Sequence, residues 1–487
     1  MKLKKLIKDL PDITLKGSKE IEITGICANS KYVCPGNLFI AKKGLTTDGH
    51  YYISEAISGG AVAVLTDIYD PSLKNVAQLI SPKVAHLESH LAKIYYGSPS
   101  DQLFMTGITG TNGKTTVSFL IKYLLDHLKF SAGLIGTIEY IIGKHRYQAT
   151  RTTPDVLSNH KLLKEMILQG CTDAVMEVTS HALTQGRVDE IDYDVAIFTN
   201  LTLDHLDYHG SMEEYCKAKN QLFRKLSDSK KKHKMAIVNH DSPWVEAIIQ
   251  GCTTPIMTYG IDNKSDLMAT DISFDAQGTR FLLCYKGQIV PCETPLIGRF
   301  NVYNILAAIG ALIARGKDLK DLLPLLKQLP SVPGRLEKVN NSLGIHIYVD
   351  FAHSDDSLLN VLKTLQEVKQ KKIITVFGCG GDRDRTKRPK MAQAAESLSD
   401  SCIVTSDNPR SEDPIKICEE IQAGFKNPSR HKVEVDRKKA IALAIEQAEP
   451  GDIVLIAGKG HETYQIFAHK TIEFDDRRIA YQICQEG

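Results

Sequence analysis

The sequence predicts an α/β protein of three domains, because three of its features agree on this architecture. The chain has 487 residues, and at about 150 residues per domain this length favours three domains. From Leu103 onward, apolar strand-like runs alternate with helical patterns, which is typical of parallel sheets with crossover helices. Breaks rich in glycine, proline and serine lie at 97–100 and 330–334. We therefore expect domains at residues 1–101, 102–333 and 334–487.

The first domain is expected to be a small α/β unit. Its strand-like runs are 21–28, 38–41 and 61–66. A helical stretch at 52–58 is closed by two glycines, and a second helix ends near Tyr96. These elements are short, so the unit is small.

The two later domains show the same alternation of strands and helices. Strands are expected in the central domain at 104–108, 174–178 and 195–199, and in the third domain at 345–349, 373–377, 402–405 and 453–457. Helical patterns lie at 322–329, 414–425 and 438–448. The pattern predicts a parallel sheet in the central domain and a Rossmann-like α/β fold in the third.

Composition excludes several classes of protein. Hydrophobic residues make up 43% and charged residues 24%, which supplies real cores and shows no signature of disorder. A net charge of +2 gives no overall cationic field for nucleic acid. Mean hydropathy is −0.17 and no export signal or membrane span is visible, so we expect a cytoplasmic protein without membrane insertion. We expect a monomer as well. Eleven cysteines without a Cys-x-x-Cys pair favour reduced packing residues.

Residues 109–116 form the sharpest motif, Thr-Gly-Thr-Asn-Gly-Lys-Thr-Thr, between the strand-like run 104–108 and an amphipathic helix. Such a loop (P-loop) wraps backbone N–H groups around phosphate oxygens at a helix N-terminus. Lys114 is expected to reach the β and γ phosphates, and the Thr115 hydroxyl to hold Mg²⁺. Ile108 stands where the standard pattern has its first glycine. The predicted nucleotide contacts are Thr109, Gly110, Thr111, Asn112, Gly113, Lys114, Thr115 and Thr116.

Two short segments favour a guanine-nucleotide switch instead of an enzyme. They are Asp-Tyr-His-Gly at 207–210 and Asn-Lys-Ser-Asp at 263–266. A guanine-reading Asn-Lys-x-Asp should follow a continuous apolar strand, whereas residues 259–262 predict a turn. A polar loop that matches by chance is the better interpretation, and the switch remains an alternative.

Three further residues suit metal and phosphoryl chemistry. Glu177 ends the run 174–178, His205 follows the run 195–199, and Lys219 lies on a helix that begins near Ser211. The ends of parallel strands converge on one edge of a sheet, where ligands bind. We therefore expect Glu177 and His205 to meet the phosphates of the loop as Mg²⁺ ligands.

Segments along nearly the whole chain resemble the Mur ligase family in order and spacing. They are 109–115, 177–181, 200–207, 298–304, 333–335 and 350–353. Three later segments, 377–384, 407–410 and 458–462, resemble the members that add the third residue of the peptidoglycan stem peptide. The resemblance implies a small N-terminal α/β domain that binds UDP, a central P-loop ATPase domain with a parallel sheet, and a C-terminal Rossmann-like domain that binds the amino acid.

The resemblance implies an ATP-dependent acid–amino-acid ligase. Its small-molecule partners would be ATP, UDP-N-acetylmuramoyl-L-alanyl-D-glutamate and meso-2,6-diaminopimelate. The γ-phosphoryl of ATP would pass to the D-glutamyl carboxylate, and the incoming amine would then attack the acyl phosphate. Lys219 matches a lysine that carries a CO₂-derived carbamate in the family. The implied catalytic residues are Lys114, Glu177, His205 and Lys219, and the implied Mg²⁺ ligands are Thr115, Glu177, His205 and the carbamate of Lys219.

Binding residues follow from the same residue-by-residue match. Further ATP contacts are implied at Asn304, Asp350 and His353. The contacts to the UDP-muramoyl dipeptide are Ser30, Thr152, Thr153, Thr179, Gln185 and Arg187. The contacts to diaminopimelate are Arg383, Asp407, Asn408, Pro409, Arg410, Gly458 and Glu462. Phe351 and Asp355 stand where the family has tyrosine and proline, which leaves the shape of that loop open.

Two ligase alternatives also remain. One is the same reaction with L-lysine, which lacks the distal carboxylate of diaminopimelate. Arg410 speaks against it, because a planar guanidinium is suited to pairing a carboxylate with two hydrogen bonds. The other is a folylpolyglutamate synthase-like ligase, which would lack a UDP-binding domain ahead of the phosphate loop.

Overall fold

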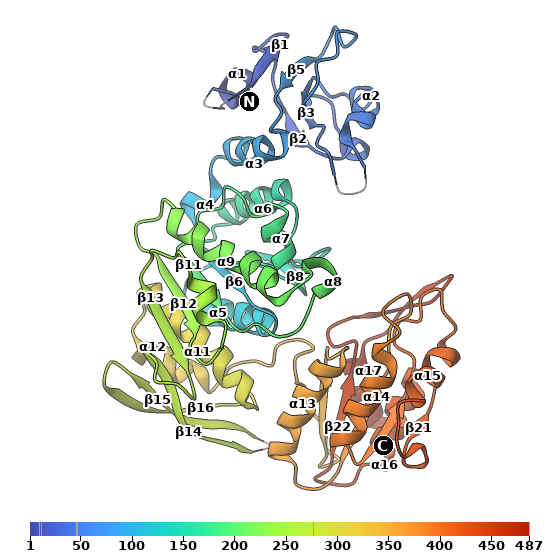
Figure 1. Ribbon diagram of the computed structural model, residues 1–487. Helices are drawn as coiled ribbons and strands as arrows, with labels where there is room; N and C mark the ends of the chain where they lie inside the picture. Colours follow the sequence, from blue (N-terminus) through green and yellow to red (C-terminus); the bar gives the residue numbers. More distant parts are fainter. Residues whose placement is uncertain (9, 11, 45–46, 276, 487) are drawn as a thin grey trace. The chain divides into compact units, whose positions relative to one another are not determined.

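The computed structural model describes residues 1–8, 10, 12–44, 47–275 and 277–486 (Figure 1). The chain divides into two compact units, one of residues 1–265 and 307–318 and one of residues 266–306 and 319–487. Both are α/β. None of the described helices combines the length and apolar character that a bilayer crossing requires.

The first unit begins with a five-stranded sheet in the order β1-β5-β4-β3-β2. Its strands are β1 (Thr14–Lys16), β2 (Gly25–Cys27), β3 (Asn37–Ile40), β4 (Ala63–Thr66) and β5 (Ala77–Ile80), and its helices are α1 (Leu3–Leu6), α2 (Ile53–Ser58) and α3 (Val84–Tyr95). β2 to β5 run parallel, and β1 pairs antiparallel with β5. β3 and β4 are buried at every position, as strands of a covered parallel sheet are. The predicted strands and helices here are confirmed, and β1 and β5 are additions.

A second sheet of the first unit has a parallel core in the order β13-β12-β11-β6-β10-β7. Its strands are β6 (Phe104–Thr109), β7 (Ala132–Ile135), β10 (Asp173–Glu177), β11 (Val195–Phe198), β12 (Met235–Asn239) and β13 (Ile256–Gly260). The antiparallel strands β8 (Glu139–Ile142) and β9 (His145–Gln148) extend it beyond β7, so the sheet is mixed, although the sequence predicted a parallel one. The parallel core is confirmed.

All but the first of the helices in this part lie between successive strands of the sheet. The helices are α4 (Pro99–Gln102), α5 (Lys114–His127), α6 (Val156–Leu168), α7 (Ser180–Thr184), α8 (Leu206–His209), α9 (Met212–Asp228) and α10 (Val245–Ile249). α11 (Arg299–Ala314) contributes residues to both units. Just after it, Arg315 Nε lies 2.7 Å from the buried Asp173 Oδ1, and the guanidinium packs over the rings of Phe104 and Phe130. Arg315 therefore neutralises a carboxylate at the start of β10.

One sequence prediction in this sheet is wrong. Tyr259 and Gly260 end strand β13 instead of forming a turn, so the segment 263–266 does follow a parallel strand. The prediction failed because the four residues before the motif include turn formers, whereas the strand itself begins earlier, at Ile256. The Asp241 carboxylate accepts hydrogen bonds from the backbone N–H groups of residues 261 to 263, which fixes this loop to the protein itself.

The second unit contains a six-stranded sheet in the order β17-β18-β22-β19-β20-β21, parallel except for β17. Its strands are β17 (Glu337–Val339), β18 (His346–Asp350), β19 (Ile373–Phe377), β20 (Ser401–Val404), β21 (Lys432–Val433) and β22 (Ile453–Ala457). The helices are α12 (Leu319–Leu326), α13 (Asp355–Val368), α14 (Lys387–Leu398), α15 (Pro414–Gln422), α16 (Arg437–Gln447) and α17 (Asp476–Glu486). The four predicted strands and the three predicted helices are confirmed, with ends shifted by a few residues.

Two antiparallel elements complete the second unit. One is the set of three antiparallel strands β14 (Leu267–Asp275), β15 (Gly278–Tyr285) and β16 (Gln288–Thr294), which are counted with the eleven-stranded sheet, and the other is the hairpin of β23 (Tyr464–Ile466) and β24 (Thr471–Glu473). Neither was predicted. β14 is only half covered, and its exposed positions alternate with buried ones instead of forming an apolar run.

Candidate active site

The phosphate loop begins at the last residue of β6, near the middle of the parallel core, and continues into the first turn of α5. Gly110 has φ +149° and Gly113 has φ +87°, conformations that side chains with a Cβ rarely adopt. A Cβ on Gly110 would lie 1.8 Å from Thr199 Oγ1, so the loop packs directly against the end of β11. Both glycines are therefore required by the shape of the loop.

Replacing Gly110 by alanine is expected to lower the free energy of unfolding by at least about 3 kcal/mol, from overpacking and from the unfavourable φ together. Gly170→Ala is the matched control, because Gly170 also has a positive φ of +77° but open space around it. Its cost should be about 1 kcal/mol. Thermal or denaturant unfolding measures both variants, and equal losses would contradict the predicted clash.

Two N–H groups of the loop already have protein partners. The N–H groups of Thr111 and Asn112 donate to the backbone and side-chain oxygens of Asn200, each at 2.9 Å. Lys114 Nζ donates to the carbonyls of Gly110 and Thr111 at 2.8 and 2.9 Å, so its ammonium lies across the loop. Phosphate contacts from the N–H groups of Thr111 and Asn112 would require their bonds to Asn200 to break.

Glu177 is fully buried at the end of β10, and its carboxylate links the phosphate loop to the segment that follows β7. Its Oε2 accepts from the hydroxyls of Thr115 at 2.9 Å and Thr137 at 3.0 Å, and its Oε1 accepts from the Thr137 N–H at 2.9 Å. Gly136 makes room for the carboxylate, because a Cβ there would lie 2.4 Å from Oε1. Thr115 and Glu177 are thus brought together as predicted.

Lys219 reaches the same loop from α9. Its side chain is buried, and Nζ donates to the Gly110 carbonyl at 2.8 Å, the oxygen that Lys114 also contacts. The Nζ atom also lies 4.5 Å from the centre of the Tyr215 ring. Burial, reinforced by the charge of Lys114, holds the pKa of Lys219 well below its ordinary value. The side chain is therefore a source of neutral amine next to the phosphate loop.

His205 immediately precedes α8, with φ +53°, and is half exposed. Its Nε2 lies 3.5 Å from Asp204 Oδ2, and burial of the ring is the main cause of its lowered pKa. Among the described residues, no hydrogen bond joins His205 to Glu177 or Lys219, and no group of three or more His, Cys, Asp and Glu side chains could hold a metal. The predicted Mg²⁺ set is thus only partly assembled.

The donors present still fit Mg²⁺ in their chemistry. Mg²⁺ prefers oxygen ligands, and the Thr115 hydroxyl and the Glu177 carboxylate meet at one point of the strand edge. The buried carboxylate lacks an ion-pair partner among the described residues and receives only neutral donors. A cation beside it would offset the cost of burying that charge.

Five of the six residues predicted to bind the dipeptide converge on Glu177. Thr152 Oγ1 lies 3.1 Å from Thr137 Oγ1, and the Thr153 hydroxyl donates to the Glu177 carbonyl at 2.8 Å. The other contacts are Thr153 to Thr179 at 3.3 Å, Arg187 to the Thr153 carbonyl at 3.0 Å and Arg187 to Gln185 Oε1 at 3.0 Å. Ser30 lies in the N-terminal sheet region, where its hydroxyl donates to Glu55. It is not part of this cluster.

The residues predicted to bind diaminopimelate form a cluster in the second unit. Arg410 has φ +52°, and its Nη1 donates to the Gly381 carbonyl at 2.7 Å. A Cβ on Gly381 would lie 1.9 Å from the Pro409 carbonyl oxygen, so the two loops pack tightly. Hydrogen bonds join the Asn408 N–H to Asp407 and the Asn408 side chain to Glu462, and a Cβ on Gly458 would lie 2.6 Å from Asp407 Oδ2. Arg383 is exposed and donates to the Asp382 carbonyl instead.

Three predicted ATP contacts also belong to the second unit. Asp350 is buried at the end of β18 and accepts from two backbone N–H groups, and burial raises its pKa. His353 Nδ1 lies 2.8 Å from the Phe351 carbonyl, and Asn304 Nδ2 donates to Asn301. Asp355 is the first residue of α13, a position that suits proline as well.

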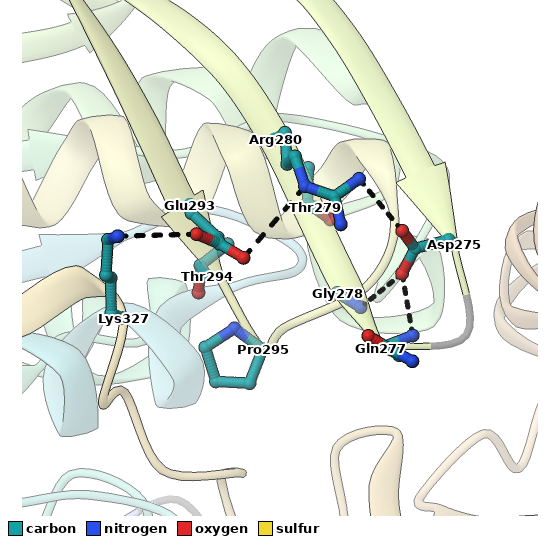
Figure 2. Close-up of a pocket in the computed structure, with 9 residues that line it drawn as sticks. All are labelled: Asp275, Gln277, Gly278, Thr279, Arg280, Glu293, Thr294, Pro295 and Lys327. Atoms are coloured by element: carbon teal, nitrogen blue, oxygen red, sulfur yellow. Dashed lines mark hydrogen bonds and ion pairs between the residues drawn. The ribbon is translucent and has the colours of Figure 1, made fainter.

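A polar hollow of about 230 Å³ lies on the β14–β16 sheet (Figure 2). Its charged groups pair with one another, with Arg280 3.0 Å from Asp275 and Lys327 3.4 Å from Glu293. None of the predicted site residues lines it. The clusters around Glu177 and Arg410 are therefore the stronger candidates for chemistry.

Models of three parts of one family match successive segments of the chain. The Mur ligase family catalytic domain matches residues 22–95, the Mur ligase middle domain residues 108–312, and the Mur ligase glutamate ligase domain residues 334–460. A Chlamydia felis (strain Fe/C-56) protein named UDP-N-acetylmuramoyl-L-alanyl-D-glutamate--2,6-diaminopimelate ligase is 46% identical over 99% of both chains. The chain belongs to the Mur ligase family. A Geobacillus thermodenitrificans (strain NG80-2) protein of the same name is 44% identical over the full length of both.

Solved structures agree with this membership. A structure titled as the same 2,6-diaminopimelate ligase has a TM-score of 0.73 and 32% identity, and covers 100% of this Mur ligase and 99% of its own chain. The Mycobacterium tuberculosis folylpolyglutamate synthase has a TM-score of 0.62 and 18% identity, covers 77% of this chain and 92% of its own, and shares the fold. The predicted three-domain α/β fold and the prediction of a ligase are confirmed, and the guanine-nucleotide switch is set aside.

Three residues of this Mur ligase that lie near these clusters were not predicted from its sequence. Thr137 follows the end of β7, and its signal was the Gly-Thr pair after an apolar strand. Tyr208, whose hydroxyl contacts Gln185 at 3.1 Å, lies in the segment 207–210 that had been treated as a match to a switch. Lys459 lies inside the segment 458–462, between two residues that were selected.

Proposed function

We propose that this Mur ligase joins meso-2,6-diaminopimelate to UDP-N-acetylmuramoyl-L-alanyl-D-glutamate, with conversion of ATP to ADP and phosphate, in peptidoglycan synthesis. The observation that carries the proposal is its near full-length similarity, at 42% to 46% identity, to relatives named for this ligation. The Arg410 turn supports the choice of amino acid, because a fixed guanidinium suits the second carboxylate of diaminopimelate. A carboxylate is a poor electrophile, so it is phosphorylated before the amine attacks.

The residues of the phosphate loop supply charge and position. Lys114 offsets the charge of the transferred phosphoryl group, and the buried Glu177 and Thr115 would hold Mg²⁺. Bound Mg²⁺ neutralises negative charge on phosphoryl oxygens. Thr152, Thr153, Thr179, Gln185 and Arg187 would orient the muramoyl peptide, because they converge on the same strand edge. His205 would complete the metal ligands from α8.

A carbamate on Lys219 is part of this proposal. The neutral amine attacks the carbon of CO₂, an N–C bond forms, and one proton leaves to solvent. A charged Lys219 would be repelled by the Lys114 ammonium at the shared Gly110 carbonyl, whereas an anionic carbamate on Lys219 would be attracted to it. The lowered pKa of Lys219 supplies the neutral amine that the addition requires.

Each of the three expected domains is proposed to bind one substrate. We assign the UDP end of the substrate to residues 1–101, ATP to residues 102–333 and the amino acid to residues 334–487. The three matched segments, 22–95, 108–312 and 334–460, fall inside these boundaries. We place the reaction in the cytoplasm, where ATP is available as co-substrate, and expect a monomer.

A phosphate-release assay tests the proposal. The enzyme is given ATP, Mg²⁺ and the UDP-muramoyl dipeptide, with meso-diaminopimelate, L-lysine or no amino acid. Sustained release is expected only with diaminopimelate, together with a product heavier than the dipeptide substrate by one diaminopimelate minus water. Release that does not depend on the dipeptide, or product with lysine alone, would contradict the proposal.

Lys219→Ala is expected to reduce ligation at least about 100-fold, because it removes the anion that the carbamate would place at the loop. Small carboxylates such as formate or acetate should restore part of the activity. Lys217→Ala is the matched control, since Lys217 lies on the same helix but is exposed and pairs with Glu214. Full activity of a folded Lys219→Ala enzyme would refute the role.

A further inference from the structure

Lys459 carries a fully buried side chain that no step of the proposed reaction uses. It lies in the loop after β22, and its Nζ donates to Glu462 Oε2 at 2.9 Å and to Asn408 Oδ1 at 3.2 Å. A buried ammonium is costly unless it is paired and hydrogen-bonded. Both of its partners belong to the diaminopimelate cluster, so its charge acts on that cluster.

Lys459 fixes the orientation of the Asn408 amide. The Asn408 Oδ1 accepts from Lys459 Nζ and from the Ile466 N–H at 3.0 Å, and the Nδ2 donates to Glu462 Oε2 at 2.8 Å. Two donors face one end of the amide and a carboxylate faces the other, so only one orientation satisfies all three. The Ile466 carbonyl in turn accepts from the Arg410 N–H at 3.0 Å. The amide therefore ties the Arg410 turn to hairpin β23–β24.

Glu462 is held by one oxygen and leaves the other for a ligand. Lys459 and Asn408 both donate to Oε2, and within the described part of the chain Oε1 accepts no hydrogen bond. The Glu462 side chain is 19% exposed, whereas Lys459 is sealed from solvent behind it. Oε1 can therefore meet an ammonium that enters from solvent, while Lys459 itself cannot touch the ligand.

We propose that Lys459 is a positioning residue that sets specificity for the amino acid. It orients the Asn408 amide and, with it, holds Glu462 Oε1 in the geometry that receives the ammonium of an α-amino-acid end group, while the Arg410 guanidinium receives its carboxylate. L-lysine has only an ammonium at its distal end and cannot bridge both groups. This inference rests on the proposed function.

The test is Lys459→Met, which keeps the length of the side chain and removes its charge. The KM for diaminopimelate is expected to rise at least about 10-fold, and discrimination against lysine to fall by a similar factor. The KM values for ATP and the UDP-muramoyl dipeptide should stay unchanged within about twofold, a split that a general loss of structure would not produce. Lys470→Met is the control, because Lys470 is an exposed lysine beside the same hairpin.

A double-mutant cycle with Glu462→Gln tests whether Lys459 acts on the amino-acid site through Glu462. If Lys459 acts through Glu462, Lys459→Met should change the KM for diaminopimelate by less than about threefold in the Glu462→Gln background. Additive effects would overturn the inference. An equal rise in all three KM values, or an unchanged KM for diaminopimelate, would also overturn it.

Failure of the proposed function can be told apart from failure of the inference about Lys459. If the unsubstituted enzyme does not use diaminopimelate, the proposed function fails before any variant is examined. If Lys459→Met does not fold, Lys459→Leu replaces it, because leucine keeps apolar bulk but offers no donor to Glu462 or Asn408. An unchanged KM for diaminopimelate in a folded Lys459→Leu enzyme overturns the inference.

Discussion

Alanine in place of Lys114 should reduce ATP-dependent product formation by at least about 10³-fold while the protein remains folded. The Lys114 ammonium lies across the Gly110 and Thr111 carbonyls at the start of α5, and its aliphatic stem is only partly buried. Removing it takes a positive charge from the phosphoryl oxygens and takes little apolar contact from the core. Phosphate release measures the first effect, and thermal unfolding measures the second.

Lys122→Ala provides the comparison for Lys114→Ala. Lys122 lies further along α5, where it pairs with Asp126 and has no role in the proposed reaction. Its replacement should leave turnover near that of the unsubstituted enzyme. Near-normal turnover of a folded Lys114→Ala enzyme would refute the assigned role.

The unsubstituted enzyme should prefer meso-diaminopimelate over L-lysine by about 10³-fold or more in kcat/KM. Lysine leaves the Arg410 guanidinium without the carboxylate it is placed to receive. Arg410→Ala is expected to remove most of this preference, chiefly by loss of activity with diaminopimelate. Alanine also carries a Cβ at φ +52°, so the backbone cost is nearly matched and the change reports the guanidinium.

Competition between the two amino acids in one reaction measures this preference directly. Arg478→Ala is the control, because Arg478 is an exposed arginine that pairs with Glu473 outside the cluster. Comparable kcat/KM for lysine in the unsubstituted enzyme would overturn the choice of amino acid and leave the ligase assignment standing.

The strands that could be predicted are those whose burial shows as a pattern within a few consecutive residues. β19 and β22 are buried at every position, so they appear as apolar runs between breakers. β5 was missed because the buried Gln78 interrupts its apolar pattern, and this glutamine is satisfied by the backbone of Asp70. The antiparallel strands β14 to β16 were missed because half of their positions face solvent.

Some of the site residues could likewise be predicted from neighbouring residues, and others could not. The phosphate loop could be predicted because its chemistry resides in eight consecutive residues, and Glu177 because it ends an apolar strand. The Thr137 N–H bonds Glu177 across 40 residues of the chain and Lys459 bonds Asn408 across 51, so the sequence alone does not display these contacts. The lowered pKa of Lys219 likewise depends on burial and on Lys114, which sequence spacing does not display.

The discontinuity of the first unit bears on how the chain folds as it is synthesised. Residues 1–265 form most of that unit, but residues 307–318 complete it, and Arg315 is the ion-pair partner of the buried Asp173. A nascent chain that ends at residue 265 would leave this carboxylate without its counter-charge and two aromatic rings without their guanidinium cover. We expect the first unit to reach its final stability only after residue 318 has left the ribosome, when part of the second unit has already been translated.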